Sequence, residues 1–141
     1  MQEDSARYVE SVVRVRYADT DQMGIAHHAN YIVWFEIGRT DLCRSVGMTY
    51  RDIEAQGYLL VVSDVSCHYR MAFRYDDEVV IHTRVGEMGS RAIEFRYELR
   101  SRRGGVGATG MSRHLWVDRK SMKPVRAPNA IVKLFEQFDR Q

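Results

Sequence analysis

The residue types best suited to chemistry lie in residues 17–31, the segment YADTDQMGIAHHANY. Asp19 and Asp21 come shortly before a predicted helix, and Gly24 lets the intervening loop turn tightly or approach a ligand closely. The start of a helix presents backbone N–H groups without intrahelical acceptors, together with the positive end of the helix dipole. Such N–H groups can polarise a carbonyl oxygen, and a nearby carboxylate can attack the carbonyl carbon or activate water. The combination suits transfer of an acyl group to water.

Each of these residues also has an ordinary structural explanation. An aspartate before a helix commonly caps it or forms an Asx turn, and Asn30 fits the same capping chemistry. The adjacent His27 and His28 are expected to point in different directions, and no third ligand lies at a useful spacing, so no metal site is predicted. Glu36 and Arg39 are three residues apart and are expected to pair on the helix surface.

One long helix is predicted to follow this segment and to position it. Its apolar residues recur every three or four positions and form a single stripe: Tyr31, Phe35, Gly38, Leu42 and Val46. Gly47 stands where a glycine commonly ends a helix. Gly38 weakens a helix interior, so its expected use is to let the helix lie close to a sheet.

Alternating apolar and polar residues predict strands on both sides of this helix. The predicted strands span 9–17, 59–73, 79–85, 93–99 and about 106–117, with a hairpin turn at 102–105, a short helical turn at 50–56 and a terminal helix at 129–138. One long helix against a curved antiparallel sheet is an α+β architecture. A sheet of this kind has exposed edges, and side-by-side pairing of two copies is an economical way to cover them.

Composition limits the classes of protein that the chain can belong to. Its 141 residues suit a single domain over 1–141, and 45% hydrophobic with 28% charged residues is typical of a folded core. The apolar runs are too short for a membrane span, and the polar, acidic N-terminus does not resemble a signal peptide. Two cysteines without metal-ligand spacing favour a reducing, cytoplasmic setting. A net charge of +2 argues against a dedicated nucleic-acid binder.

Residues 17–31 resemble the 4-hydroxybenzoyl-CoA thioesterase family and its relatives, the short acyl-CoA thioesterases found with Tol–Pal genes. The likeness rests on the pattern Y-x-D-T-D-x-x-G-x-x-x-H-x-N-Y, and extends to residues 35–36, 39–40, 69–72, 75–77 and 123–128. It implies a hotdog fold, in which a curved antiparallel β-sheet of about five strands wraps a long central helix. It also implies hydrolysis of an acyl-CoA thioester to a free acid and coenzyme A, with no cofactor, by a homo-oligomer, either a dimer or a tetramer.

The resemblance implies a role for individual residues of this sequence. Asp21 matches the catalytic carboxylate, and the backbone N–H of His28 matches the group that polarises the carbonyl. Asp19 is expected to hold the loop. His27 departs from the family, which often has an aromatic residue there, so the acyl preference stays open.

Further residues are expected to meet the substrate. The candidates are Gly24, Asn30 and Tyr31 beside the catalytic segment, and Ser90 and Arg91 for the nucleotide. The more common explanation of Tyr31 is a core position, and that of Ser90 and Arg91 is a solvated turn.

Two alternatives remain open from the sequence. Other hotdog proteins carry their catalytic carboxylate on the long helix, which would make Glu36 the acid. The chain could instead be a non-catalytic module that binds acyl-CoA or regulates through it. Incubation with a panel of acyl-CoAs separates these possibilities, because hydrolysis releases a thiol and binding does not.

Overall fold

The computed structural model describes residues 7–140. In chain order the elements are β1 (Val9–Arg14), η2 (Tyr17–Asp19), α1 (Ala29–Ser45), α2 (Tyr50–Ala55), β2 (Tyr58–Tyr69), β3 (Glu78–Met88), β4 (Ala92–Ser101), β5 (Val106–Asp118) and α3 (Asn129–Arg140). The predicted order of a strand, a long helix, four strands and a terminal helix is confirmed. Residues 1–6, part of the segment used to predict that a signal peptide is absent, lie outside this description. Within residues 7–140, no helix is long and apolar enough to cross a membrane.

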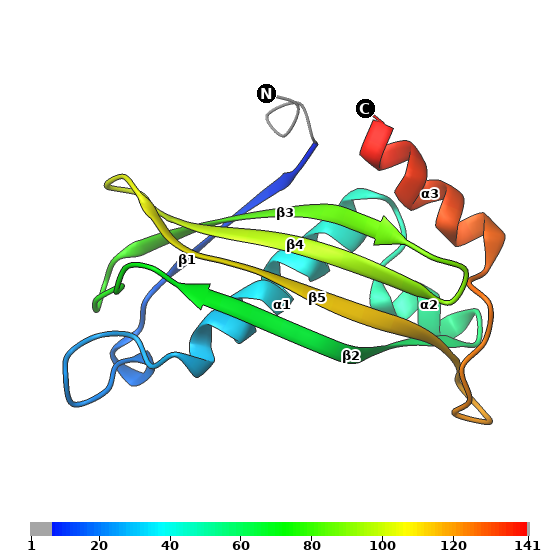
Figure 1. Ribbon diagram of the computed structural model, residues 1–141, viewed down its shortest axis with the longest axis horizontal. Coiled ribbons are helices and arrows are strands. Elements are labelled where there is room, and N and C mark those ends of the chain that lie inside the picture. The colour runs from blue at the N-terminus through cyan, green and yellow to red at the C-terminus, as the bar shows by residue number, and fades with distance from the viewer. Residues whose placement is uncertain (1–6, 141) are drawn as a thin grey trace.

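The strands form one antiparallel sheet in the order β1-β3-β4-β5-β2. The two edge strands are therefore β1 and β2. The sheet curves around α1, which lies along one face, and α3 lies at the end of the sheet that carries the β3–β4 turn (Figure 1). This is the α+β hotdog arrangement predicted from the sequence.

Close contact between α1 and the sheet depends on Phe35 and Gly38. The Phe35 ring stacks on Tyr97 of β4 with ring centroids 4.3 Å apart and an interplanar angle of 6°. A Cβ atom at Gly38 would overlap the Thr83 hydroxyl oxygen and lie 2.8 Å from Cγ2 of Ile81. The predicted use of Gly38, to bring the helix close to the sheet, is therefore confirmed.

The expected surface pair between Glu36 and Arg39 is wrong. Arg39 is buried and donates hydrogen bonds to the hydroxyls of Tyr50 and Tyr97. It points to the sheet because it lies on the same helix face as Phe35, one turn further along. Tyr97 continues the polar chain through Ser112, which is 2.8 Å from Nε2 of His114, and burial lowers the pKa of His114 to about 3.

Two predicted strands end earlier than their sequence pattern suggests. Tyr17 was expected to continue the buried face of the first strand, but it is 80% exposed because the chain turns into η2. The second strand ends at Tyr69 rather than residue 73. There the N–H groups of Arg70 and Met71 both donate to the carbonyl of Gly107, which interrupts the regular ladder.

Replacement of Gly38 by Ala tests how closely α1 approaches the sheet. The added methyl meets Thr83 and Ile81, so we expect the free energy of unfolding to fall by about 1–3 kcal/mol, measured by urea denaturation. Gly89→Ala is the control, since its Cβ would meet no atom within 4 Å, and a change within about 0.5 kcal/mol is expected. Stabilisation by Gly38→Ala, as at an exposed helical site, would contradict the close packing.

Candidate active site

The loop that carries Asp21 is closed by its own backbone. The Asp21 N–H donates to the Ile25 carbonyl, and the Gly24 N–H donates to the Asp21 carbonyl, both at 2.9 Å. Gly24 has φ +80, a left-handed conformation that glycine adopts at little cost. The Ala26 N–H then donates to the Phe73 carbonyl at 2.8 Å, which connects the loop to the segment after β2. Asp21 therefore occupies a fixed loop just before α1.

Asp19 is the buried carboxylate of the pair. Its side chain accepts the Arg16 N–H at 2.9 Å and the Arg16 guanidinium at 2.8 Å. The hydrogen bonds from Arg16 hold the pKa of Asp19 below its usual range. The Asp19 carbonyl accepts the His27 N–H at 2.8 Å and Nδ2 of Asn30 at 2.9 Å. Asp19 thus fastens the loop to the start of α1, which is the structural role expected for it.

Asn30 fixes the peptide group between His27 and His28. The His27 carbonyl accepts the Asn30 N–H at 3.0 Å and Nδ2 of Asn30 at 3.2 Å. Because C=O and N–H point in opposite directions in a trans peptide, the His28 N–H points away from the body of the helix. The Ala29 N–H bonds to Nδ1 of His27 at 3.2 Å, and the Tyr31 N–H bonds to the His28 carbonyl at 3.1 Å. Four backbone N–H groups, those of residues 28–31, begin the helix. Within residues 7–140, only the His28 N–H among them has no acceptor.

The loop engages only one oxygen of the Asp21 carboxylate in a hydrogen bond. Oδ1 of this carboxylate accepts the Met23 N–H at 2.8 Å, which is the Asx turn considered as the ordinary explanation. Its other oxygen has no hydrogen-bond partner among the described residues. The positive end of the α1 dipole favours a negative charge in this region. One oxygen of Asp21 is therefore available for chemistry, in a loop that the bond from the His27 N–H to the Asp19 carbonyl fastens to the start of α1.

The expectation that His27 and His28 point in different directions is wrong. Their rings stack, with centroids 4.3 Å apart and an interplanar angle of 28°. The reason is that His27 precedes the helix, so its side chain folds back toward the Ala29 N–H instead of following helical spacing. Among residues 7–140, no three His, Cys, Asp or Glu side chains are grouped closely enough to hold a metal ion.

Tyr69 contacts the start of α1 and was not singled out from the sequence. Its hydroxyl donates to the His28 carbonyl at 3.2 Å, and its ring lies edge-on to Tyr31 at 4.8 Å. Burial raises the pKa of Tyr69 to about 12, so the phenol stays a donor at neutral pH. The sequence signal available was its place in the family-like run 69–72. Tyr31 itself is 4% exposed and donates to the Met71 carbonyl at 3.3 Å, so a substrate contact by its side chain stays a prediction.

Ser90 and Arg91 lie in the exposed turn between β3 and β4, as expected. The Ser90 carbonyl accepts the Ala127 N–H, and the Arg91 carbonyl accepts the Trp116 N–H. This turn and the Asp21 loop lie at opposite ends of the sheet (Figure 1). One chain therefore does not bring Ser90 and Arg91 near Asp21.

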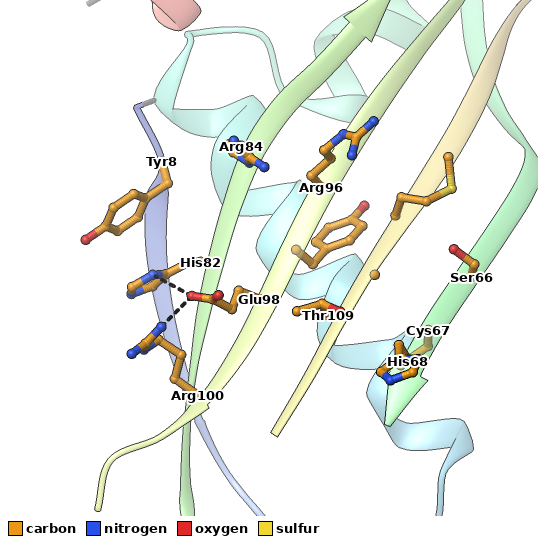
Figure 2. A pocket seen from close by; sticks show the side chains of 13 residues that line it. Tyr8, Ser66, Cys67, His68, His82, Arg84, Arg96, Glu98, Arg100 and Thr109 are labelled. Atoms are coloured by element: carbon orange, nitrogen blue, oxygen red, sulfur yellow. Dashed lines mark hydrogen bonds and ion pairs between the residues drawn. The ribbon is translucent and has the colours of Figure 1, made fainter. Parts of the chain in front are cut away.

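A hollow of about 890 Å³ lies on the outer face of the sheet, opposite α1. Charged side chains that alternate with the buried residues of β4 line it, among them Arg96, Glu98 and Arg100 (Figure 2). Arg100 pairs with Glu98 at 2.6 Å, and His82 lies 4.0 Å from the same carboxylate. The hollow includes neither Asp21 nor the start of α1, so we do not assign the acyl group to it.

The family model for the thioesterase-like superfamily matches residues 15–135, which include the Asp21 loop, α1 and the four strands β2 to β5. The chain belongs to the thioesterase-like superfamily. This membership confirms the predicted hotdog-fold thioester hydrolase. The narrower likeness to the 4-hydroxybenzoyl-CoA enzymes stays a prediction.

Named relatives of this thioesterase-like chain span most of its length. It is 38% identical to Bacillus subtilis YneP over 114 residues, which are 81% of this chain and 83% of YneP. It is 32% identical to the acyl-CoA thioesterase YbgC of Haemophilus influenzae over 127 residues, 89% of this chain and 93% of YbgC. The crystal structure of a DHNA-CoA thioesterase from Staphylococcus aureus is similar with a TM-score of 0.87 at 28% identity, covering 92% of this chain and 89% of that one.

Asp19→Asn tests the fastening of the loop through its pH dependence. The lowered pKa of Asp19 means that its ionised form stabilises the fold above the unfolded-state pKa, and that this stability is lost as pH falls through the folded-state pKa. At pH 7 we expect the variant to lose roughly 1–3 kcal/mol of unfolding free energy, the cost of hydrogen bonds to a charged group. The difference from wild type should shrink below about pH 4. Urea denaturation between pH 7 and pH 3 measures it, and an equal loss at every pH would contradict the role of the charge.

Proposed function

We propose that this thioesterase hydrolyses an acyl-CoA, with Asp21 as the catalytic carboxylate and the His28 N–H as the donor to the thioester carbonyl oxygen. The observation that carries the proposal is the unengaged His28 N–H at the start of α1, which the Asp19 carbonyl fastens to the loop whose Asp21 carboxylate has one oxygen free. Acyl-CoA is the substrate class named for the Haemophilus influenzae relative, which supports its choice here.

The chemistry follows from these two groups. As the carbonyl carbon becomes tetrahedral, negative charge builds on its oxygen, where the N–H and the helix dipole stabilise it. Asp21 either attacks the carbon, giving a mixed anhydride that water then hydrolyses, or removes a proton from the attacking water. In both paths the C–S bond breaks and coenzyme A leaves as a thiolate. Gly24 keeps the loop in its turn, and Asn30 orients the peptide that carries the donor.

We infer that two copies of the chain build the complete site. Strand β2 is an edge strand that exposes three valines, Val61, Val62 and Val65. An apolar edge of this kind favours pairing with a second sheet. A two-fold axis pairs β2 antiparallel with its copy, so each strand's Tyr69 end lies beside the other's Tyr58 end. That pairing brings the Asp21 loop of one copy to the end of the sheet where the other carries Ser90 and Arg91.

This dimer accounts for the separation of the predicted substrate residues within one chain. Coenzyme A is long and carries phosphates at the end opposite its thioester. Ser90 offers a hydroxyl and Arg91 a guanidinium, which pairs with phosphate oxygens. Association of two dimers into a tetramer remains an expectation from the family resemblance.

Asp21→Asn distinguishes the catalytic role of Asp21 from its role in the Asx turn with Met23. Asn keeps an oxygen for the Met23 N–H, so the loop should persist, but it removes the charge and the nucleophile. We expect kcat for the best acyl-CoA to fall roughly a hundredfold or more, with KM changed less than about threefold. Thiol release measures both constants, and circular dichroism checks the fold. Glu36→Gln is the control. A collapse of turnover in Glu36→Gln, with near-normal turnover in Asp21→Asn, would assign the catalytic role to Glu36. Binding of acyl-CoA by the wild type without thiol release would indicate a binding module.

The edge-strand dimer is tested by placing a charge on β2. Val65→Lys should weaken dimerisation at least about tenfold and lower activity in parallel, because each copy would place a positive charge on the edge that pairs with the other. Val12→Lys is the matched control, since Val12 lies on the other edge strand and is also 44% exposed. Light scattering coupled to size exclusion, with activity measured over a range of protein concentrations, reads out the effect. A fully active monomer of the wild-type chain would contradict the shared site.

A further inference from the structure

The side chain of His27 provides a helix cap that the N-cap residue does not. His28 occupies the N-cap position with helical backbone angles, φ −58 and ψ −28, and makes no side-chain capping bond. Nδ1 of His27 accepts the Ala29 N–H instead, at 3.2 Å. This bond from residue i to the N–H of residue i+2 has the pattern of an Asx turn, with an imidazole nitrogen in place of a carboxylate oxygen.

The surroundings of His27 hold this geometry in place. Its N–H donates to the Asp19 carbonyl and its carbonyl accepts from Asn30, so its backbone is fixed on both sides. Its ring stacks on that of His28, and the His28 ring lies edge-on to Tyr69 at 6.2 Å. The peptide between His28 and Ala29 is therefore bonded at both ends, through its carbonyl to Tyr69 and through its N–H to His27.

We propose that neutral His27 is a positioning residue for thioester hydrolysis: its Nδ1 holds the first turn of α1 and leaves the His28 N–H as the single donor for the substrate carbonyl. The inference rests on the proposed function, since it concerns the same donor. It gives a role to His27, the residue at which this sequence departs from the family it resembles.

The bond requires one protonation state of the imidazole. Nδ1 accepts a hydrogen bond only when the ring is neutral with its proton on Nε2. A protonated ring has two donors and no acceptor, and it would place a positive charge at the positive end of the helix dipole. The titratable groups around His27 are His28, which stacks on it, and Asp19, whose carbonyl accepts the His27 N–H and whose carboxylate pairs with Arg16. Tyr69 contacts His28, and Asp21 precedes His27 in the same loop. Protonation of His27 should therefore release the Ala29 N–H and loosen the turn that presents the His28 N–H.

Two substitutions distinguish the contribution of the Nδ1 acceptor of His27 from that of its flat ring. His27→Asn keeps an acceptor for the N–H of residue i+2 but cannot change charge, whereas His27→Phe keeps a flat ring against His28 without an acceptor. Acyl-CoA hydrolysis is followed from pH 5 to pH 8, the interval over which imidazoles change charge. At pH 8 we expect His27→Asn to stay within about threefold of wild type, and His27→Phe to lose roughly three- to tenfold in kcat with KM almost unchanged, the scale of a lost cap.

The pH profile distinguishes this role from a purely structural one. Acidification that protonates the His27 ring should lower the kcat of the wild type more than that of His27→Asn, because only the wild type loses its cap by protonation. His82→Asn, a histidine change on the outer face of the sheet, should keep the wild-type profile. Equal kcat and equal pH profiles for wild type and His27→Phe would overturn the proposal.

An NMR measurement on the full chain tests the bond without any substrate. With the imidazole nitrogens labelled, Nδ1 of His27 should show the shift of an unprotonated acceptor at pH 8, and the Ala29 amide proton should titrate together with the ring. In His27→Asn the Ala29 amide should not follow that titration. A protonated Nδ1 at pH 8, or an Ala29 amide that ignores the ring, would overturn the inference. An intact bond in a chain that releases thiol from no acyl-CoA would refute the hydrolase proposal instead.

Discussion

The backbone carbonyl of Asp19 connects the two parts of the site, because it accepts hydrogen bonds from both the His27 N–H and the Asn30 side chain. Through the first bond the Asp21 loop is fastened to the start of α1. Through the second, Asn30 is placed where it also bonds the His27 carbonyl and so turns the His28 N–H outward. The buried Asp19 carboxylate, held by Arg16, keeps this carbonyl in position. The Asp21 carboxylate and the His28 N–H, which lie on different segments, thus keep a fixed relation.

The rest of the fold supplies the rigid base that this arrangement needs. The helix that ends in the free N–H is pressed against β3 and β4 through Phe35 and Gly38, so its axis has little freedom to shift. Tyr69 reaches the same helix start from the end of β2, which joins the site to an edge strand. Because that edge is apolar and open, the site lies where a second copy of the chain would be expected to complete it.

The sequence predicted the elements well, because periodicity is a local signal. The stripe from Tyr31 to Val46 gave α1, with Gly47 just after its end, and alternation gave β1, β3 and β4. Two of its failures concern contacts between distant segments. The inward direction of Arg39 depends on Tyr50 and Tyr97, and no local pattern specifies those phenols. The early end of β2 depends in the same way on Gly107 of β5.

In the candidate site, too, the residues that are close in sequence could be predicted and the longer-range contacts could not. Asp21, Gly24, His28 and Asn30 are close in sequence, so one motif was enough to group them. The bond from Tyr69 and the capping by His27 require the folded geometry. The separation of Ser90 and Arg91 from Asp21 follows from the topology of the sheet, since a strand-to-strand turn lies at one end or the other according to strand direction.

The central claim is that one backbone N–H polarises the substrate, and it can be tested on that atom alone. Replacing the amide of residue 28 by an ester, through incorporation of the α-hydroxy analogue of histidine, removes the N–H and keeps the side chain. We expect kcat for the best acyl-CoA to fall roughly a hundred- to a thousandfold, as for loss of one oxyanion donor, with the fold retained. His28→Ala, which keeps the N–H and removes the imidazole, should retain measurable turnover. An ester variant with wild-type kcat would contradict the account.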